Sequence, residues 1–330
     1  MQKKTNMYTP KILGLGNALV DIIINLDDDR LLEKLELPKG SMQLVDHDRA
    51  QQILDYFADS PQTLASGGSA ANTINGIANF GGKTSFLGCV GADVYGDFFE
   101  NDMLENEITP QLFRGTAGTG TAITLMSADS ERTFATHLGS AIELSAKHLS
   151  PKVFEGYDLV HIEGYLVQNY DLIRTGMQLA KQAGCRVSLD LASYNIVEEN
   201  VPFLTEMLEN YVDILFANEE EARAFCGKSP EEALSFFAKH TAYAVVKLGK
   251  NGSLIQHKNQ VEHIGTPKNI EVIDTNGAGD AYAAGFLFSV MSGMDLNTCG
   301  QMGAKLAGEV VQVVGPKLSP SKWDSIWKKI

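Results

Sequence analysis

The second half of the chain alternates short apolar runs with longer segments of helical pattern, and this alternation restricts the fold more than any other feature. The pattern predicts strands at residues 159–162, 186–191 and 213–217, and helices at residues 170–183 and 196–209. Successive strand–helix–strand units connect in a right-handed sense and place parallel strands side by side. We therefore expect an α/β fold with a mostly parallel central sheet and helices on both faces. In such a sheet, ligands bind at the carboxyl ends of the strands.

Two segments, residues 18–46 and 111–138, have β-type patterns that lie outside this alternation. Residues 121–125 alternate apolar and polar side chains, residues 128–130 resemble a hairpin tip, and residues 132–136 form the return strand. We expect the two segments to form a small β-sheet lid. Because the sequence contains no linker and no internal repeat, we expect one domain spanning residues 1–330 with the lid inserted in it.

A glycine-rich motif, Asp-Thr-Asn-Gly-Ala-Gly-Asp at residues 274–280, lies between a predicted short strand at 270–273 and an apolar run long enough for a helix. The first turn of a helix has free N–H groups and favours negative charge. Gly277, Ala278 and Gly279 are therefore predicted to form an anion cradle. Asp280 stands where a hydroxyl that attacks a phosphoryl group would need a base, and we expect it to be ionised and only weakly basic at neutral pH. An Asp at a helix start is also a common N-cap, so both interpretations stay open.

The motif resembles a known signature. Residues 274–287 are similar to the C-terminal signature of the PfkB, or ribokinase-like, carbohydrate and nucleoside kinases, and Asn276 before Gly-Ala-Gly-Asp resembles the adenosine kinase branch. Residues 66–72 and 91–96 resemble the N-terminal signature of the same family. The resemblance covers roughly residues 12–315, nearly the whole chain, and we expect the last residues, 316–330, to be peripheral. It implies a ribokinase-like fold, a catalytic base at Asp280 and an anion hole at residues 277–279.

The resemblance also implies a pocket for the phosphate acceptor. An amide and a carboxylate at Asn17 and Asp21 suit a vicinal diol, although Asp21 alone could equally end a turn. Apolar residues at four positions, 44, 134, 165 and 166, resemble the base pocket of adenosine kinases. The residues that fall at acceptor positions are Asn17, Asp21, Leu44, Gly67, Gly68, Asn72, Phe134, Thr136, Tyr165 and Leu166.

The resemblance also implies a binding site for ATP, called the nucleotide side below, which two further segments would form. Asn218-x-x-Glu221 follows a predicted strand and matches the family's magnesium-and-phosphate motif, while an acidic helix start explains the same residues. The segment from Lys247 to Gly252 resembles the part of the family that lies along ATP, with Lys247 where many members have Thr. The residues assigned to the nucleotide are Asn218, Lys247, Gly249, Gly252 and Asn276, with Mg²⁺ held by Asn218 and Glu221 through water. Some relatives also bind K⁺, which makes K⁺ a candidate cofactor.

Arg132 is a candidate phosphate contact, and a solvated charge on the lid hairpin is the alternative interpretation. The predicted activity is transfer of a phosphoryl group from ATP to the 5′-hydroxymethyl group of a nucleoside, with adenosine favoured. A sugar kinase for a ribose- or fructose-like acceptor is the alternative, and a non-catalytic nucleoside or sugar sensor is the alternative of another class. Gly14-x-Gly16 lacks the third glycine of a dinucleotide fingerprint, which argues against a nicotinamide oxidoreductase.

The composition and the charge of the chain limit the binding partners and the cellular setting that we expect. The formal net charge of -14 argues against a nucleic-acid partner, because phosphates need clustered Lys and Arg. The four cysteines are widely spaced and form no CxxC pair, which fits a reducing cytoplasmic setting. We find no signal peptide pattern and no apolar run as long as the roughly 18 residues that a membrane span needs. Relatives are monomers or dimers joined through the lid, and both states stay open for this chain.

Overall fold

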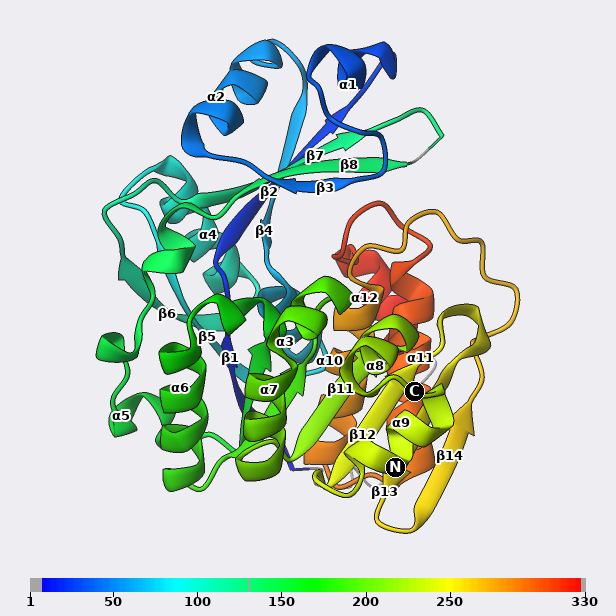
Figure 1. The fold of residues 1–330 in the computed structure, drawn as a ribbon. Helices are drawn as coiled ribbons and strands as arrows, with labels where there is room; N and C mark the ends of the chain where they lie inside the picture. Colours follow the sequence, from blue (N-terminus) through cyan, green and yellow to red (C-terminus); the bar gives the residue numbers. More distant parts are fainter. Residues whose placement is uncertain (1–7, 130, 328–330) are drawn as a thin grey trace, which may run out of the picture.

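The computed structural model describes residues 8–129 and 131–327. Two β-sheets organise this part of the chain, and a layer of helices covers each face of the larger one (Figure 1). No described helix combines the length and the apolar character that a membrane crossing needs.

The large sheet has nine strands in the order β14-β13-β12-β11-β10-β9-β1-β5-β6. The strands from β6 to β12 are parallel, and β13 and β14 add an antiparallel hairpin at one edge. Central strands such as β1 and β9 are buried on both faces, which explains the apolar run Ile-Leu-Gly-Leu of β1. The strands are β1 Lys11–Leu15, β5 Lys83–Val90, β6 Ile108–Arg114, β9 Leu159–Glu163, β10 Arg186–Asp190, β11 Ile214–Asn218, β12 Tyr243–Lys247, β13 Ser253–His257 and β14 Gln260–Ile264.

The helices divide between two hydrophobic clusters, one on each face of the large sheet. One face carries α3 Ser69–Asn79, α4 Val94–Glu105, α10 Ala278–Met291, α11 Leu296–Val310 and α12 Pro320–Trp327. The other face carries α5 Pro151–Phe154, α6 Tyr170–Gln182, α7 Tyr194–Asn210, α8 Glu219–Cys226 and α9 Pro230–Phe237. Short 3₁₀ helices are η1 Gly139–Glu143, η2 Ala146–His148, η3 Gly164–Gln168 and η4 Gly249–Asn251.

Helix α10 is buried along almost its whole length and packs against α3 and α11. An apolar helix without a polar face must lie inside the protein. A Cβ at Gly285 would meet the backbone of Met302, so this glycine allows α10 and α11 to pack closely. The start of α10, which carries Asp280, is thereby held near the carboxyl ends of the central strands.

The second sheet has five strands in the order β3-β8-β7-β2-β4 and lies above the large sheet in Figure 1. Its strands are β2 Leu19–Asn25, β3 Met42–Leu44, β4 Gln62–Gly67, β7 Gly120–Met126 and β8 Arg132–His137. Helices α1 Arg30–Lys34 and α2 His47–Tyr56 pack apolar side chains against it. The expected α/β fold with a small second β-sheet is confirmed.

Four local expectations were wrong. Residues 111–114 belong to β6, which pairs with β5 in the large sheet rather than with the lid. Strand β4 was not expected, and residues 270–273 form a loop instead of a strand. The segment after residue 315 was expected to be peripheral, but Trp323 and Ile326 are buried and Trp323 packs against Phe80. Each difference depends on contacts with a distant segment, which a local pattern does not encode.

Candidate active site

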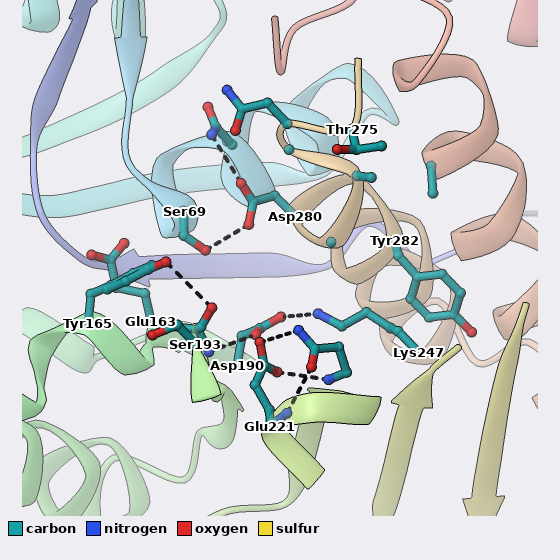
Figure 2. A pocket seen from close by; sticks show the side chains of 18 of the residues that line it. Ser69, Glu163, Tyr165, Asp190, Ser193, Glu221, Lys247, Thr275, Asp280 and Tyr282 are labelled. Atoms are coloured by element: carbon teal, nitrogen blue, oxygen red, sulfur yellow. Dashed lines mark hydrogen bonds and ion pairs between the residues drawn. The ribbon is translucent and has the colours of Figure 1, made fainter. Parts of the chain in front are cut away.

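A cavity of about 1310 Å³ lies between the five-stranded sheet, called the lid sheet below, and the carboxyl ends of the strands in the large sheet. Four neighbouring parallel strands, β9 to β12, each end on a polar residue that lines this cavity. These residues are Glu163, Asp190, Asn218 and Lys247. Figure 2 shows Glu163, Asp190 and Lys247 below the start of α10, whose residues 277–280 also line the cavity. The position agrees with the rule that ligands bind at strand carboxyl ends.

Asp280 faces this cavity from the first turn of α10. Its carboxylate accepts hydrogen bonds from the Ser69 hydroxyl (2.7 Å) and the Asn72 amide (3.0 Å), both on α3 (Figure 2). The helix N-cap is Gly277 and no side chain caps the helix, so the N-cap interpretation of Asp280 was wrong. Burial raises the pKa of Asp280 to about 6, and the two hydrogen bonds only partly offset it. The carboxylate is therefore a stronger base than we expected from its place at a helix start.

The predicted anion cradle forms the turn into α10, and Gly277, Ala278 and Gly279 all line the cavity. Gly277 has a φ of 73°, and a Cβ here would lie 2.5 Å from the Pro316 Cβ, so the turn requires glycine. The Ala278 amide donates to the Thr275 carbonyl (3.2 Å) within the turn. An anion would therefore meet chiefly the amides of the two glycines.

Most residues predicted for the acceptor line the cavity, namely Asn17, Asp21, Leu44, Gly68, Asn72, Phe134, Thr136 and Tyr165. Leu166 does not, because η3 turns it into the hydrophobic cluster on the far side of the sheet. Gly67 does not line the cavity either. A Cβ at Gly67 would overlap the Asp21 carboxylate, so this glycine makes room for Asp21. Burial raises the pKa of Asp21 to about 7.

Sequence reasoning missed Glu163, which is 1% exposed and links two parts of the acceptor side. One oxygen of its carboxylate accepts from the Asn17 backbone (3.0 Å) and side-chain amide (2.7 Å), and the other accepts from the Ala70 backbone (2.9 Å). Burial raises the pKa of Glu163 to about 7, against these hydrogen bonds. Asp190 and Ser69 were also missed. A polar residue at the end of an apolar strand is a signal that could have found Glu163 and Asp190.

The nucleotide side contains all the residues predicted for it, since Asn218, Glu221, Lys247, Gly249, Gly252 and Asn276 line the cavity. Asn218 and Glu221 form a reciprocal capping box at the start of α8, with N–H donors at 2.6 and 2.8 Å from carboxylate oxygens. They therefore cap a helix and face the cavity at once. Burial raises the pKa of Glu221 to about 7. Lys247 donates to Asp190 at 2.8 Å.

Arg132 lies outside the main cavity and lines a smaller one of about 440 Å³ beside it. It is 8% exposed and pairs with Asp274 at 2.6 Å, so the alternative interpretation, a solvated hairpin charge, was wrong. Asp274 also accepts from the backbone amides of Asn276 (3.0 Å) and Gly315 (2.7 Å). Arg132 is thereby connected through Asp274 to the turn that precedes α10.

The site therefore combines the Asp280 carboxylate with the glycine turn that begins α10, in a cavity of about 1310 Å³ beside the five-stranded sheet. A carboxylate can accept a proton from a hydroxyl, and the free amides of a helix start can bind a phosphate. Residues 58–323 match the model described as pfkB family carbohydrate kinase, and the chain belongs to that family. This confirms the resemblance on which the site was predicted.

Individual relatives match the chain over almost their full lengths. An adenosine kinase from Sinorhizobium meliloti is 32% identical with a TM-score of 0.87, covering 98% of this chain and 100% of that one. A probable sugar kinase from Rhizobium etli is 31% identical with a TM-score of 0.87, covering 98% and 99%. An adenosine kinase from Saccharomyces cerevisiae is 28% identical, covering 95% of this chain and 98% of its own.

Proposed function

We propose that the chain transfers the γ-phosphoryl group of ATP to the 5′-hydroxyl of a nucleoside, with adenosine as the favoured acceptor. The observation that carries the proposal is Asp280, which faces the cavity between the acceptor residues and the glycine turn. Two adenosine kinases among the similar proteins support the choice of acceptor. Apolar lid side chains, including Met42, Leu44 and Phe134, support an acceptor with a base rather than a bare sugar.

In the proposed step the acceptor hydroxyl gives its proton to the Asp280 carboxylate as its oxygen bonds to the γ-phosphorus. The bond from that phosphorus to the β,γ-bridging oxygen breaks, and ADP leaves with the electron pair. The transition state of phosphoryl transfer is loose, so correct positioning contributes more than a strong base. Asn17 and Asp21 would hold the ribose diol, and the amides of Gly277 and Gly279 would face the charge on the moving group.

A hydrated Mg²⁺ fits the nucleotide side better than a directly bound metal. Within residues 8–129 and 131–327, no group of three or more His, Cys, Asp or Glu could hold a metal ion by itself. Both oxygens of Glu221 accept hydrogen bonds from Asn218, and the buried carboxylates of Asp190 and Glu221, with the half-buried carboxylate of Asp280, leave a surplus of negative charge. Asn218 and Glu221 would therefore orient waters of an ion that arrives with ATP, and the ion would supply charge neutralisation on the phosphates.

The lid provides a reason for transfer to the acceptor rather than to water. Met42 and Leu44 on β3 are 54% and 58% exposed although they line the cavity. An apolar base between them and the core would cover these side chains, so acceptor binding would favour lid closure. A closed lid would exclude water and suppress hydrolysis of ATP.

A sugar kinase is the second candidate, because one similar structure is a probable sugar kinase and because Asn17 and Asp21 suit any vicinal diol. A non-catalytic sensor is disfavoured by the hydrogen-bonded carboxylate of Asp280 at the glycine turn. Adenosine, ribose and fructose should be offered in parallel with ATP, Mg²⁺ and K⁺, with ADP as the readout. ADP formed with adenosine alone supports the proposal. ADP formed with a free sugar alone supports the second candidate, and tight ligand binding without ADP supports the sensor.

A further inference from the structure

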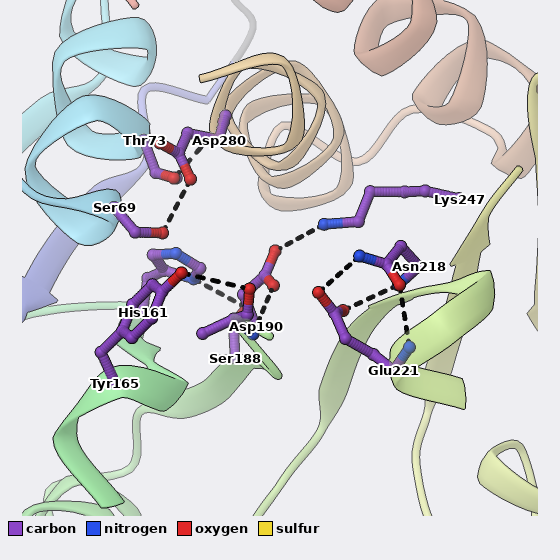
Figure 3. A network of polar contacts seen from close by, with 11 residues as sticks. Ser69, Thr73, His161, Tyr165, Ser188, Asp190, Asn218, Glu221, Lys247 and Asp280 are labelled. Carbon is purple, nitrogen blue, oxygen red and sulfur yellow. Dashed lines mark hydrogen bonds and ion pairs between the residues drawn. The ribbon is translucent and has the colours of Figure 1, made fainter. Parts of the chain in front are cut away.

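Lys247 brings a positive charge to the wall of the cavity. It is the last residue of β12, and its ammonium group reaches across the end of β11 to Asp190 on β10 (Figure 3). Burial opposes the charge, but the carboxylates of Asp190 and Glu221 outweigh burial and raise the pKa of Lys247. The side chain is therefore cationic at neutral pH.

The ammonium group lies next to the predicted anion cradle. The Lys247 Nζ is 3.1 Å from the position that a Cβ would take at Gly279. A phosphoryl group held on the amides of this turn would lie within reach of that nitrogen. Glycine at position 279 keeps the space between the ammonium group and the turn open.

Asp190 fixes the ammonium group in this place. One carboxylate oxygen accepts from Lys247 at 2.8 Å, and the other accepts from the Ala192 backbone amide at 3.2 Å. The side chain of Asp190 is 7% exposed, so it has little freedom to turn away. Because Asp190 is bound at both oxygens, Lys247 is positioned before any ligand arrives.

We propose that Lys247 binds the γ-phosphoryl group during its transfer and that Asp190 is the positioning residue that holds Lys247 at the glycine turn. The inference rests on the proposed kinase function. Charge spreads over the three equatorial oxygens in a loose transition state. A fixed ammonium group stabilises bound ATP and stabilises the transition state further, so its loss weakens binding of the γ-phosphoryl group and also lowers kcat. The Thr that many family members have at this position supplies a hydroxyl but no charge.

The alternative is an ion pair that only neutralises a buried carboxylate. The two roles predict different activities for the double variant in a double-mutant cycle made from Lys247→Met and Asp190→Asn. If Lys247 serves only to neutralise Asp190, removing both charges restores activity. If Lys247 binds the phosphoryl group, Asp190→Asn cannot restore what Lys247→Met removes.

We expect Lys247→Met to lower kcat by about 10²–10³, with a KM for the acceptor within about threefold of wild type. We expect the double variant to stay at that level. Lys239→Met, which removes an exposed lysine at the end of α9, is the matched control and should leave kcat unchanged. Recovery of the double variant to within about threefold of wild type overturns the inference, as does a Lys247→Met enzyme with unaltered kcat. If Lys247→Met does not fold, Lys247→Thr is the replacement variant, since many relatives carry Thr there.

Nucleotide binding tests the same contact without an acceptor. Lys247→Met should weaken binding of β,γ-imido-ATP by at least about tenfold and binding of ADP by less than about threefold, because only the former has a γ-phosphoryl group. Equal weakening of both overturns the inference. A wild-type protein that binds neither nucleotide overturns the proposed function itself, so the two failures are distinguishable.

Discussion

Replacing Asp280 by Asn should give a protein that is inactive yet more stable than wild type at alkaline pH. The change keeps the size of the side chain and still accepts the Ser69 hydroxyl. Its new amide would face the Asn72 amide, but the buried Oδ1 of Asn72 has no hydrogen-bond partner within the described residues. Rotation of the Asn72 amide would bring this oxygen to the new donor. The fold and the site geometry should therefore survive.

The size of the expected gain in stability follows from the environment of the Asp280 carboxylate. Burial raises the pKa of Asp280 from 3.8 to about 6. A difference of this size corresponds to about 3 kcal/mol, an upper value because the carboxylate faces the open cavity. A raised carboxyl pKa destabilises the folded state as pH rises from the unfolded value through the folded one. Asp280→Asn should thus gain up to about 3 kcal/mol in free energy of unfolding at pH 8, and almost none at pH 4.

The activity of the Asp280→Asn variant should fall, although its stability rises. Removal of a general base lowers kcat by roughly 10²–10⁴. Urea unfolding at pH 4 and pH 8, calorimetric binding of ADP and adenosine, and ADP formation measured on the same preparation test all three expectations. A variant that keeps more than about a tenth of wild-type kcat would refute the role of Asp280 as base. A variant that is less stable at pH 8 than wild type would refute the electrostatic reasoning.

Three further predictions follow from the site. The kcat/KM for the acceptor should fall as pH drops from 8 to 5, because Asp280 and Asp21, with pKa values of about 6 and about 7, lose their charge; a flat pH profile would contradict this. Glu163→Gln should raise the KM for adenosine by about tenfold and leave the KM for ATP unchanged, since Glu163 orients Asn17; equal changes in both would indicate general loosening. Gly67→Ala should weaken adenosine binding by at least about tenfold because its Cβ overlaps Asp21, whereas Gly265→Ala, with nothing within 4 Å of its Cβ, should bind normally.

Part of the site could be predicted because its residues lie in contiguous motifs. Residues 277–280 and Asn218-x-x-Glu221 each combine a strand or helix end with residue types that have a clear chemical use. Glu163 and Asp190 obey the same strand-end rule but stand in no motif, and they were missed. The rule that charged residues at the ends of buried parallel strands face the ligand would have found both.

Other features depend on contacts between segments far apart in the chain. The basicity of Asp280 depends on Ser69 and Asn72, about 200 positions earlier, and on burial that only the folded protein creates. Arg132 reads as a hairpin charge until the loop at Asp274 covers it. Leu166 and Tyr165 look alike as apolar candidates, and only the 3₁₀ turn of η3 decides which one faces the cavity. These properties belong to tertiary structure and have no local pattern.

A crystal structure with adenosine and β,γ-imido-ATP bound would test the central claim most directly. The claim predicts the adenosine 5′-oxygen within about 2.6–3.2 Å of the Asp280 carboxylate, and the γ-phosphoryl group on the amides of Gly277 and Gly279. A nucleoside whose 5′-oxygen points away from Asp280, or a triphosphate that does not reach the glycine turn, would contradict it.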